Sequence, residues 1–186
     1  MEQGLFRGAG IVNHHHHAPA TLYLTVDAVC YDERGVNKIS TVVFGPWELR
    51  VNVEQTRSCY QQTDEVSAEG CGCDPCRNFA LTRQLAYPPE VIAFFKDLGI
   101  DRWKPFELSH YSKMPSGRHL YGGWHYFCGS VENGPRGKAT VHRITPTFEI
   151  ELNPVEHPRQ PFPDSASVQL DFYTELPWIL DAPEPE

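Results

Sequence analysis

Three cysteines lie within six consecutive positions of the sequence, in the stretch GCGCDPCRNF at residues 70–79. One residue separates Cys71 from Cys73, and two residues separate Cys73 from Cys76. Such spacings let a bending backbone direct neighbouring thiolates at one point, and the intervening glycines and proline supply the bends. Zinc prefers soft thiolate ligands in a tetrahedron. We therefore predict a zinc site in which Cys71, Cys73 and Cys76 are three of the ligands.

The fourth ligand of a structural zinc site has to come from another segment, because such sites usually use four cysteine or histidine side chains. Cys59, twelve residues upstream of Cys71, is the first choice. Cys128, His119 and His125 are alternatives, which require a later strand region to pack over the cysteine loop. Copper(I) also suits thiolates, whereas the spacing matches no ferredoxin pattern for an iron–sulfur cluster.

A bound zinc ion would stabilise a segment that cannot order itself by hydrophobic packing. Residues 55–78 show little apolar periodicity, so this segment cannot bury enough surface to order itself. A structural zinc contributes about 10–16 kcal/mol of apparent binding free energy in small metal-dependent folds. Zinc would therefore hold a loop that is weak on its own.

The cysteines also permit redox chemistry. The tetrapeptide Cys73-Asp74-Pro75-Cys76 is expected to begin a helix, and it resembles the C-x-P-C active site of thioredoxin-like proteins. The resemblance covers these four residues and implies a thiol–disulfide oxidoreductase that uses Cys73 and Cys76. A helix N-terminus stabilises a thiolate, whereas the carboxylate of Asp74 raises the pKa of thiols near it. In that family the motif follows a buried parallel strand, but here it follows the polar residues SAEGCG.

Composition indicates one packed domain. The chain has 186 residues, of which 40% are hydrophobic and 12% aromatic, and its net charge is −8. The acidic excess lies outside residues 55–118, and it argues against binding to nucleic acid and for a basic protein partner. No secretory signal and no long apolar segment is visible, so we expect a cytoplasmic protein that does not bind membranes. The run His14–His17 is interpreted as an expression remnant or a flexible tail rather than a metal site.

Alternating apolar residues predict strands with one buried face. The first covers Thr21–Tyr31. The next begins near Ile39, breaks at Gly45-Pro46 and continues from Trp47 to Glu54. Two more are centred on FEIEL (148–152) and VQLDFYTE (168–175).

Helix signals flank the cysteines. Asp74 as N-cap and Pro75 as first helical residue predict a helix that extends to about Ala86. A second helix is expected after Pro88-Pro89, with Gly99 ending it in a left-handed conformation.

The residues HLYGGWHYFCGSVE (119–132) contain two adjacent glycines between aromatic-rich arms. This pattern predicts either a tight hairpin, in which Tyr121 faces Trp124, or one strand with a bulge at the glycines.

The predicted class is α+β with strands dominant, as an antiparallel sheet or β-sandwich with a two-helix, cysteine-bearing insertion. We expect a flexible segment at residues 1–20, a single globular domain at 21–180 with the insertion at about 55–117, and an acidic tail at 181–186. Residue patterns of this kind leave the oligomeric state open.

The function predicted from these features is a small intracellular protein without enzymatic activity. It would act as a binding, adaptor or immunity-type module whose cysteine loop is held by zinc. Two enzymatic alternatives stay open. One is the oxidoreductase described above, and the other is a metal-dependent enzyme in which one coordination position of the ion remains available to water.

Overall fold

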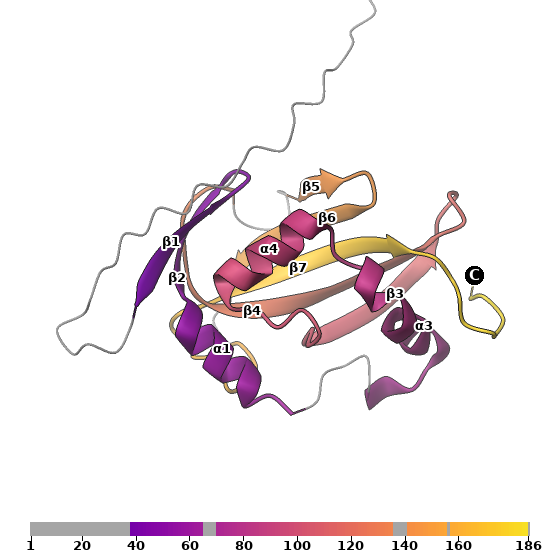
Figure 1. Ribbon diagram of the computed structural model, residues 1–186, viewed down its shortest axis with the longest axis horizontal. Helices are drawn as coiled ribbons and strands as arrows, with labels where there is room; N and C mark the ends of the chain where they lie inside the picture. Colours follow the sequence, from indigo (N-terminus) through magenta and orange to yellow (C-terminus); the bar gives the residue numbers. More distant parts are fainter. Residues whose placement is uncertain (1–37, 65–69, 136–140, 156, 186) are drawn as a thin grey trace, which may run out of the picture.

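The computed structural model describes residues 38–64, 70–135, 141–155 and 157–185. Within these ranges seven strands form one antiparallel sheet: β1 (Ile39–Phe44), β2 (Trp47–Asn52), β3 (Glu107–Lys113), β4 (His119–Asn133), β5 (His142–Thr145), β6 (Phe148–Pro154) and β7 (Ser167–Leu176). Their spatial order is β1-β2-β4-β7-β6-β5, and β3 pairs with β4 (Figure 1). The predicted strand at Thr21–Tyr31 and the run His14–His17 lie outside the described residues.

The described part of the chain includes the helices α1 (Val53–Gln61), α3 (Asp74–Thr82) and α4 (Pro89–Leu98), and the short 3-10 helix η1 (Arg83–Leu85). Figure 1 shows α4 crossing the face of the sheet over β7 and β4. The ring of Phe95 on α4 packs against His125 of β4 with centroids 4.9 Å apart, and Phe94 stacks on Phe44 of β1 at 3.9 Å. The predicted class, α+β with a dominant antiparallel sheet, is therefore confirmed.

The strands β1 and β2 form a hairpin around Gly45, which has a φ of +53°. Trp47, Leu49 and Val51 are buried, as their alternation predicts. The expected continuation of this strand to Glu54 is wrong, because α1 begins at Val53. Asn52 ends the strand, and its side-chain oxygen accepts a hydrogen bond from the free amide of Gln55 at 3.0 Å. The alternation that predicts a strand from Trp47 to Glu54 did not reveal the helix that begins after Asn52.

The two predicted helices are present with small shifts. Asp74 is the first helical residue rather than the N-cap, which is Cys73. The helix α3 ends at Thr82, and the 3-10 helix η1 follows it and ends at Leu85. Gly99 ends α4 with a φ of +79°, as predicted.

Of the two alternatives at Gly122-Gly123, the tight hairpin is wrong, because β4 runs as one strand through both glycines. The expected bulge at the glycines is not seen in the pairing with β7. The register of β4 with β7 is continuous from His119 opposite Leu176 to Cys128 opposite Ser167. The glycines instead permit close packing between strands. A Cβ atom on Gly123 would lie 2.1 Å from the backbone oxygen of Glu107 in β3. The segment 55–117, predicted as a helical insertion, thus also contains a strand that joins the sheet.

The centre of the core contains a wholly buried histidine, His125. The hydroxyl of Tyr60 lies 3.4 Å from its Nδ1, and the hydroxyl of Tyr87 lies 3.1 Å from its Nε2. Tyr60 donates its own proton to the carbonyl of Tyr126 at 3.0 Å, so it acts as the acceptor toward His125. The proton of the neutral ring is therefore on Nδ1, and Nε2 accepts from Tyr87. Burial lowers the pKa of His125 to about 3.

This histidine is expected to make stability depend on pH. Unfolding exposes the ring and returns its pKa from about 3 to the ordinary value of 6.5, so the unfolded chain takes up a proton that the folded chain excludes. The stabilisation is complete above pH 6.5 and is lost as pH falls toward 3. We expect about 2 kcal/mol to be lost at about pH 5 relative to pH 7. Urea unfolding of the wild type and of His125→Gln, which keeps hydrogen-bonding groups without titrating, checks this. Equal pH slopes for the two proteins would contradict the assignment.

Among the described residues, no helix is long and apolar enough to cross a membrane.

Candidate metal centre

The three clustered cysteines lie where the chain enters α3. Cys73 has an extended backbone (φ −72°, ψ 158°) and is the N-cap of the helix. Its carbonyl accepts the first helical hydrogen bond from the amide of Arg77 at 2.9 Å. Cys76 lies in the first turn of α3, and Cys71 precedes the helix. Pro75 fits this first turn because a helix leaves its first amides without partners in any case.

The structure brings the three predicted sulfur atoms together. All three lie within 4.8 Å of one another, and the sulfurs of Cys71 and Cys73 are 3.2 Å apart. Zinc–sulfur bonds of about 2.3 Å in a tetrahedron place neighbouring sulfurs about 3.8 Å apart. The observed spacing is close to that value, so binding an ion requires little movement. Gly72, with a φ of +67°, makes the bend that turns Cys71 back toward Cys73.

Burial and charge differ across the cluster. Cys71 and Cys73 are exposed, whereas Cys76 is buried against the core. The backbone amide of Cys73 donates to the sulfur of Cys71, and this and the neighbouring thiols lower the pKa of Cys71. Burial raises the pKa of Cys76, and the sulfurs of Cys73 and Cys71 raise it further. The pKa is therefore lowered at the exposed Cys71 and raised at the buried Cys76. A bound cation would favour the thiolate form of both side chains.

The structure does not bring Cys59 to this cluster. Its sulfur is 3.9 Å from that of Cys128 and 3.5 Å from the carbonyl of Pro161, within the packing of α1 against β4. Both of these cysteines are buried, and burial raises the pKa of Cys128 to about 12. In the part of the chain that the structure describes, no further Cys, His, Asp or Glu joins the three sulfurs. Cys59 as fourth ligand stays a prediction from the sequence.

The two histidines considered as alternative ligands have other neighbours. The ring nitrogens of His125 face Tyr60 and Tyr87. Nδ1 of His119 lies 2.9 Å from Nε2 of His110 on β3. His119 and His125 therefore contact other residues of the sheet and its covering helices, and neither belongs to the cysteine cluster.

Asn78, which was not among the residues singled out from the sequence, fixes α3 in place. Its wholly buried amide donates to the hydroxyl of Tyr121 at 3.1 Å and to the carbonyl of Pro177 at 3.0 Å. Its oxygen accepts from the backbone amides of Ile179 and Leu180 at 2.8 and 3.2 Å. One side chain therefore joins the cysteine-bearing helix to the sheet and to the chain after β7. A signal was present, because an asparagine beside Phe79 on the apolar face of a helix needs buried partners.

The segment expected as an acidic tail also has a defined contact. Glu184 forms an ion pair with Lys113 at the end of β3. This contact places the residues after β7 beside β3, on the same side of the molecule as α3 (Figure 1).

Three thiolates in this geometry can hold a soft or borderline metal ion and leave a fourth position for water or for a group outside the described residues. Alternatively, two of them can form a disulfide. Comparison of the chain with models of protein families, with curated proteins and with solved structures gave no match in any of the three.

Proposed function

We propose that this protein is a zinc-binding protein in which Cys71, Cys73 and Cys76 hold the ion at the beginning of α3. The observation that carries the proposal is the convergence of the three sulfur atoms to within 4.8 Å of one another. Thiolates are the preferred ligands of structural zinc. Zinc would stabilise the chain at the entry to α3, where residues 70–73 are exposed and have few packing contacts of their own.

The role proposed for the whole protein is that of a binding, adaptor or immunity-type module without enzymatic activity. Two features support it. Cys71 and Cys73 are exposed and lie outside the hydrophobic core, which is consistent with a local, structural task for the ion. The net charge of −8 favours a basic protein partner. Free thiols at the surface suit the reducing environment of the cytoplasm.

Elemental analysis of the purified protein tests the metal site. We expect about one zinc per chain in the wild type, because three thiolates hold zinc tightly. Cys71→Ser and Cys73→Ser each remove an exposed ligand with little effect on packing, and we expect each to lower zinc affinity at least about tenfold. Cys128→Ala is the matched control and should retain zinc fully, because its sulfur contacts Cys59 instead.

Thiol labelling, mapped by mass spectrometry, gives a second measurement on the same proteins. In the native metal-free protein Cys71 and Cys73 should react quickly and Cys59 and Cys128 slowly, because the first two are exposed and the others buried. Zinc should protect Cys71 and Cys73. A protein that carries no metal, and whose exposed thiols react at the same rate with and without added zinc, would refute the proposal. Loss of zinc in Cys59→Ala would establish the fourth ligand.

A second candidate function is thiol–disulfide exchange, and one observation favours it. Cys73 is the exposed N-cap of α3, and Cys76, three residues later in the first turn, is buried with a raised pKa. An exposed attacking thiol and a buried resolving thiol suit a reaction in which both are oxidised to a disulfide while a substrate disulfide is reduced to two thiols. The two electrons and two protons pass from the protein to the substrate.

The variants described above distinguish the two functions. Cys71 is a proposed metal ligand, but it takes no part in the Cys73–Cys76 disulfide. Cys71→Ser should therefore bind zinc more weakly under the first proposal. Under the second proposal it should still reduce a test disulfide, such as that of insulin. Metal-free protein with a Cys73–Cys76 disulfide would support the second function.

A further inference from the structure

The three sulfur atoms of the cysteine cluster differ in how easily dissolved molecules reach them. Cys71 and Cys73 are exposed, whereas Cys76 is buried in the first turn of α3. The sulfur atoms of Cys71 and Cys73 are also in contact, at 3.2 Å. Cysteines that are reversibly oxidised are typically accessible to solvent and have a second thiol beside them. The two exposed cysteines meet both conditions.

The backbone between these two cysteines allows their sulfur atoms to join. Gly72 is the single residue between them, and its φ of +67° turns Cys71 back toward Cys73. A Cβ atom on Gly72 would meet nothing within 4 Å, so the bend lies in open space and can adjust. A disulfide bond is about 2.05 Å long, so the two sulfurs have to approach by about 1 Å.

The other neighbouring cysteines are less accessible to an oxidant. The sulfur atoms of Cys59 and Cys128 are 3.9 Å apart, but both side chains are buried where α1 packs on β4. Cys76 belongs to the hydrophobic core, so a bond between Cys73 and Cys76 involves a side chain that solvent hardly reaches. A bond between Cys71 and Cys73 joins two side chains that are already at the surface.

We propose that a peroxide oxidises Cys71 and Cys73 to a disulfide and that this reaction releases zinc from the cluster. The inference rests on the zinc site proposed above and describes its regulation. Zinc binds deprotonated thiols, and the sulfurs of a disulfide no longer carry the negative charge that binds the ion. One new bond therefore removes two of the three sulfur ligands at once.

The reaction takes place in two steps. The thiolate of one cysteine attacks an oxygen of hydrogen peroxide, the O–O bond breaks, and a sulfenic acid and a hydroxide ion form. The thiolate of the second cysteine attacks the oxidised sulfur, the S–S bond forms, and a second hydroxide leaves. The two thiolates lose two electrons in total and the peroxide gains them, while the two hydroxides take up two protons and become water.

The product is expected to be easy to reduce. A disulfide between Cys71 and Cys73 closes a small ring around Gly72 and stays exposed, and exposed or strained disulfides are the labile ones. A dithiol reductant therefore restores both thiols, and with them the zinc site. Zinc occupancy would follow the redox state of the surroundings.

Hydrogen peroxide added to the zinc-loaded, full-length protein tests this regulation. A chromophoric chelator measures the released zinc, and peptide mass spectrometry identifies the disulfide. We expect about one zinc to be released for each Cys71–Cys73 disulfide that forms, because the remaining sulfur cannot hold the ion alone. Dithiothreitol, followed by removal of the reductant and addition of zinc, should restore the original zinc content.

Two variants serve as controls. Cys128→Ala should release zinc at the wild-type rate, because its sulfur lies beside Cys59 and outside the cluster. Metal-free Cys76→Ser, checked for folding by circular dichroism, should still form the Cys71–Cys73 disulfide in peroxide, because it keeps both exposed thiols.

The outcomes separate this inference from the proposed function. A wild type that takes up no zinc refutes the zinc site and its regulation together. A wild type that binds zinc but keeps it in peroxide, or that releases it with a mapped Cys73–Cys76 bond, refutes the regulation alone. Release of zinc in step with the Cys71–Cys73 disulfide, and its return after reduction, establishes the regulation.

Discussion

Gly123→Ala is expected to lower the free energy of unfolding by at least about 3 kcal/mol. The added Cβ would lie 2.1 Å from the backbone oxygen of Glu107, and the aromatic ring of Phe172 lies at 3.1 Å in another direction. A backbone oxygen in a paired strand cannot move aside alone. The pairing in which Leu108 lies opposite Gly123 would therefore have to open or shift.

Urea unfolding followed by circular dichroism measures this change. Gly70→Ala is the matched control, because a Cβ at that position meets nothing within 4 Å and the backbone needs no left-handed conformation. We expect the control to change stability by less than about 0.5 kcal/mol. A Gly123→Ala protein as stable as the wild type would mean that β3 does not pair closely with β4. This prediction therefore tests the strand arrangement directly.

Asn78→Ala is expected to cost about 3 kcal/mol of unfolding free energy. The substitution removes four hydrogen bonds at once, because the side chain links Tyr121, Pro177, Ile179 and Leu180. Two of the groups left behind are backbone amides, which lose their acceptor. Part of this free energy is recovered if the chain after β7 detaches, because the two backbone amides can then form hydrogen bonds with water. We therefore also expect faster hydrogen exchange in residues 177–185.

The neighbouring residue on the same helix supplies the control for this prediction. Arg77 is exposed and forms an ion pair with Asp74 at 2.9 Å, with both side chains about half exposed. Arg77→Ala should change stability by no more than about 1 kcal/mol. If Asn78→Ala behaves like Arg77→Ala, with unchanged exchange after β7, the asparagine does not hold the chain end. Elemental analysis of both variants shows in addition whether the cysteine cluster depends on this anchoring.

Features that depend on a few consecutive residues could be predicted from the sequence. Trp47, Leu49 and Val51 share a buried face because side chains alternate along a strand. Gly99 ends α4 because glycine adopts a positive φ without steric cost. The meeting of Cys71, Cys73 and Cys76 belongs to the same class, since they lie within six positions beside a helix start. Short spacing limits how far apart such side chains can be.

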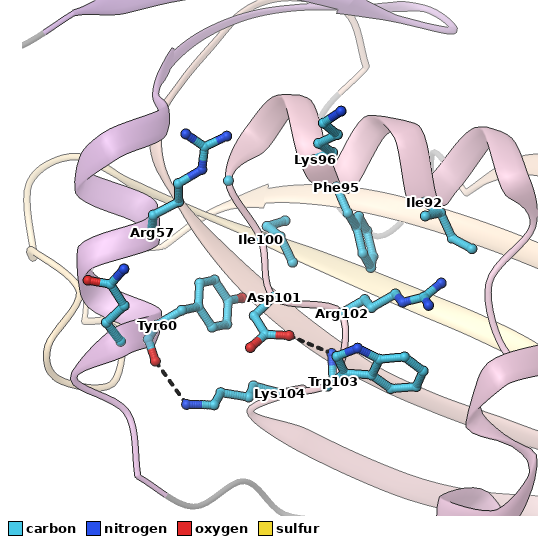
Figure 2. Close-up of a pocket in the computed structure, with 12 residues that line it drawn as sticks. Arg57, Tyr60, Ile92, Phe95, Lys96, Ile100, Asp101, Arg102, Trp103 and Lys104 are labelled. Atoms are coloured by element: carbon cyan, nitrogen blue, oxygen red, sulfur yellow. Dashed lines mark hydrogen bonds between the residues drawn. The ribbon is translucent and has the colours of Figure 1, made fainter.

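Features that join distant segments were decided by the tertiary structure alone. The pair Gly122-Gly123 has the composition of a turn, but pairing with β7 and the close approach of β3 keep the chain extended. Cys59 lies next to Cys128 because α1 docks on β4, and no spacing along the chain indicates this. A cavity whose lining includes Arg57, Lys96, Arg102 and Lys104 forms where α1, α4 and the loop after α4 meet (Figure 2). In each case the deciding free energy comes from packing between residues far apart in sequence, which local patterns do not encode.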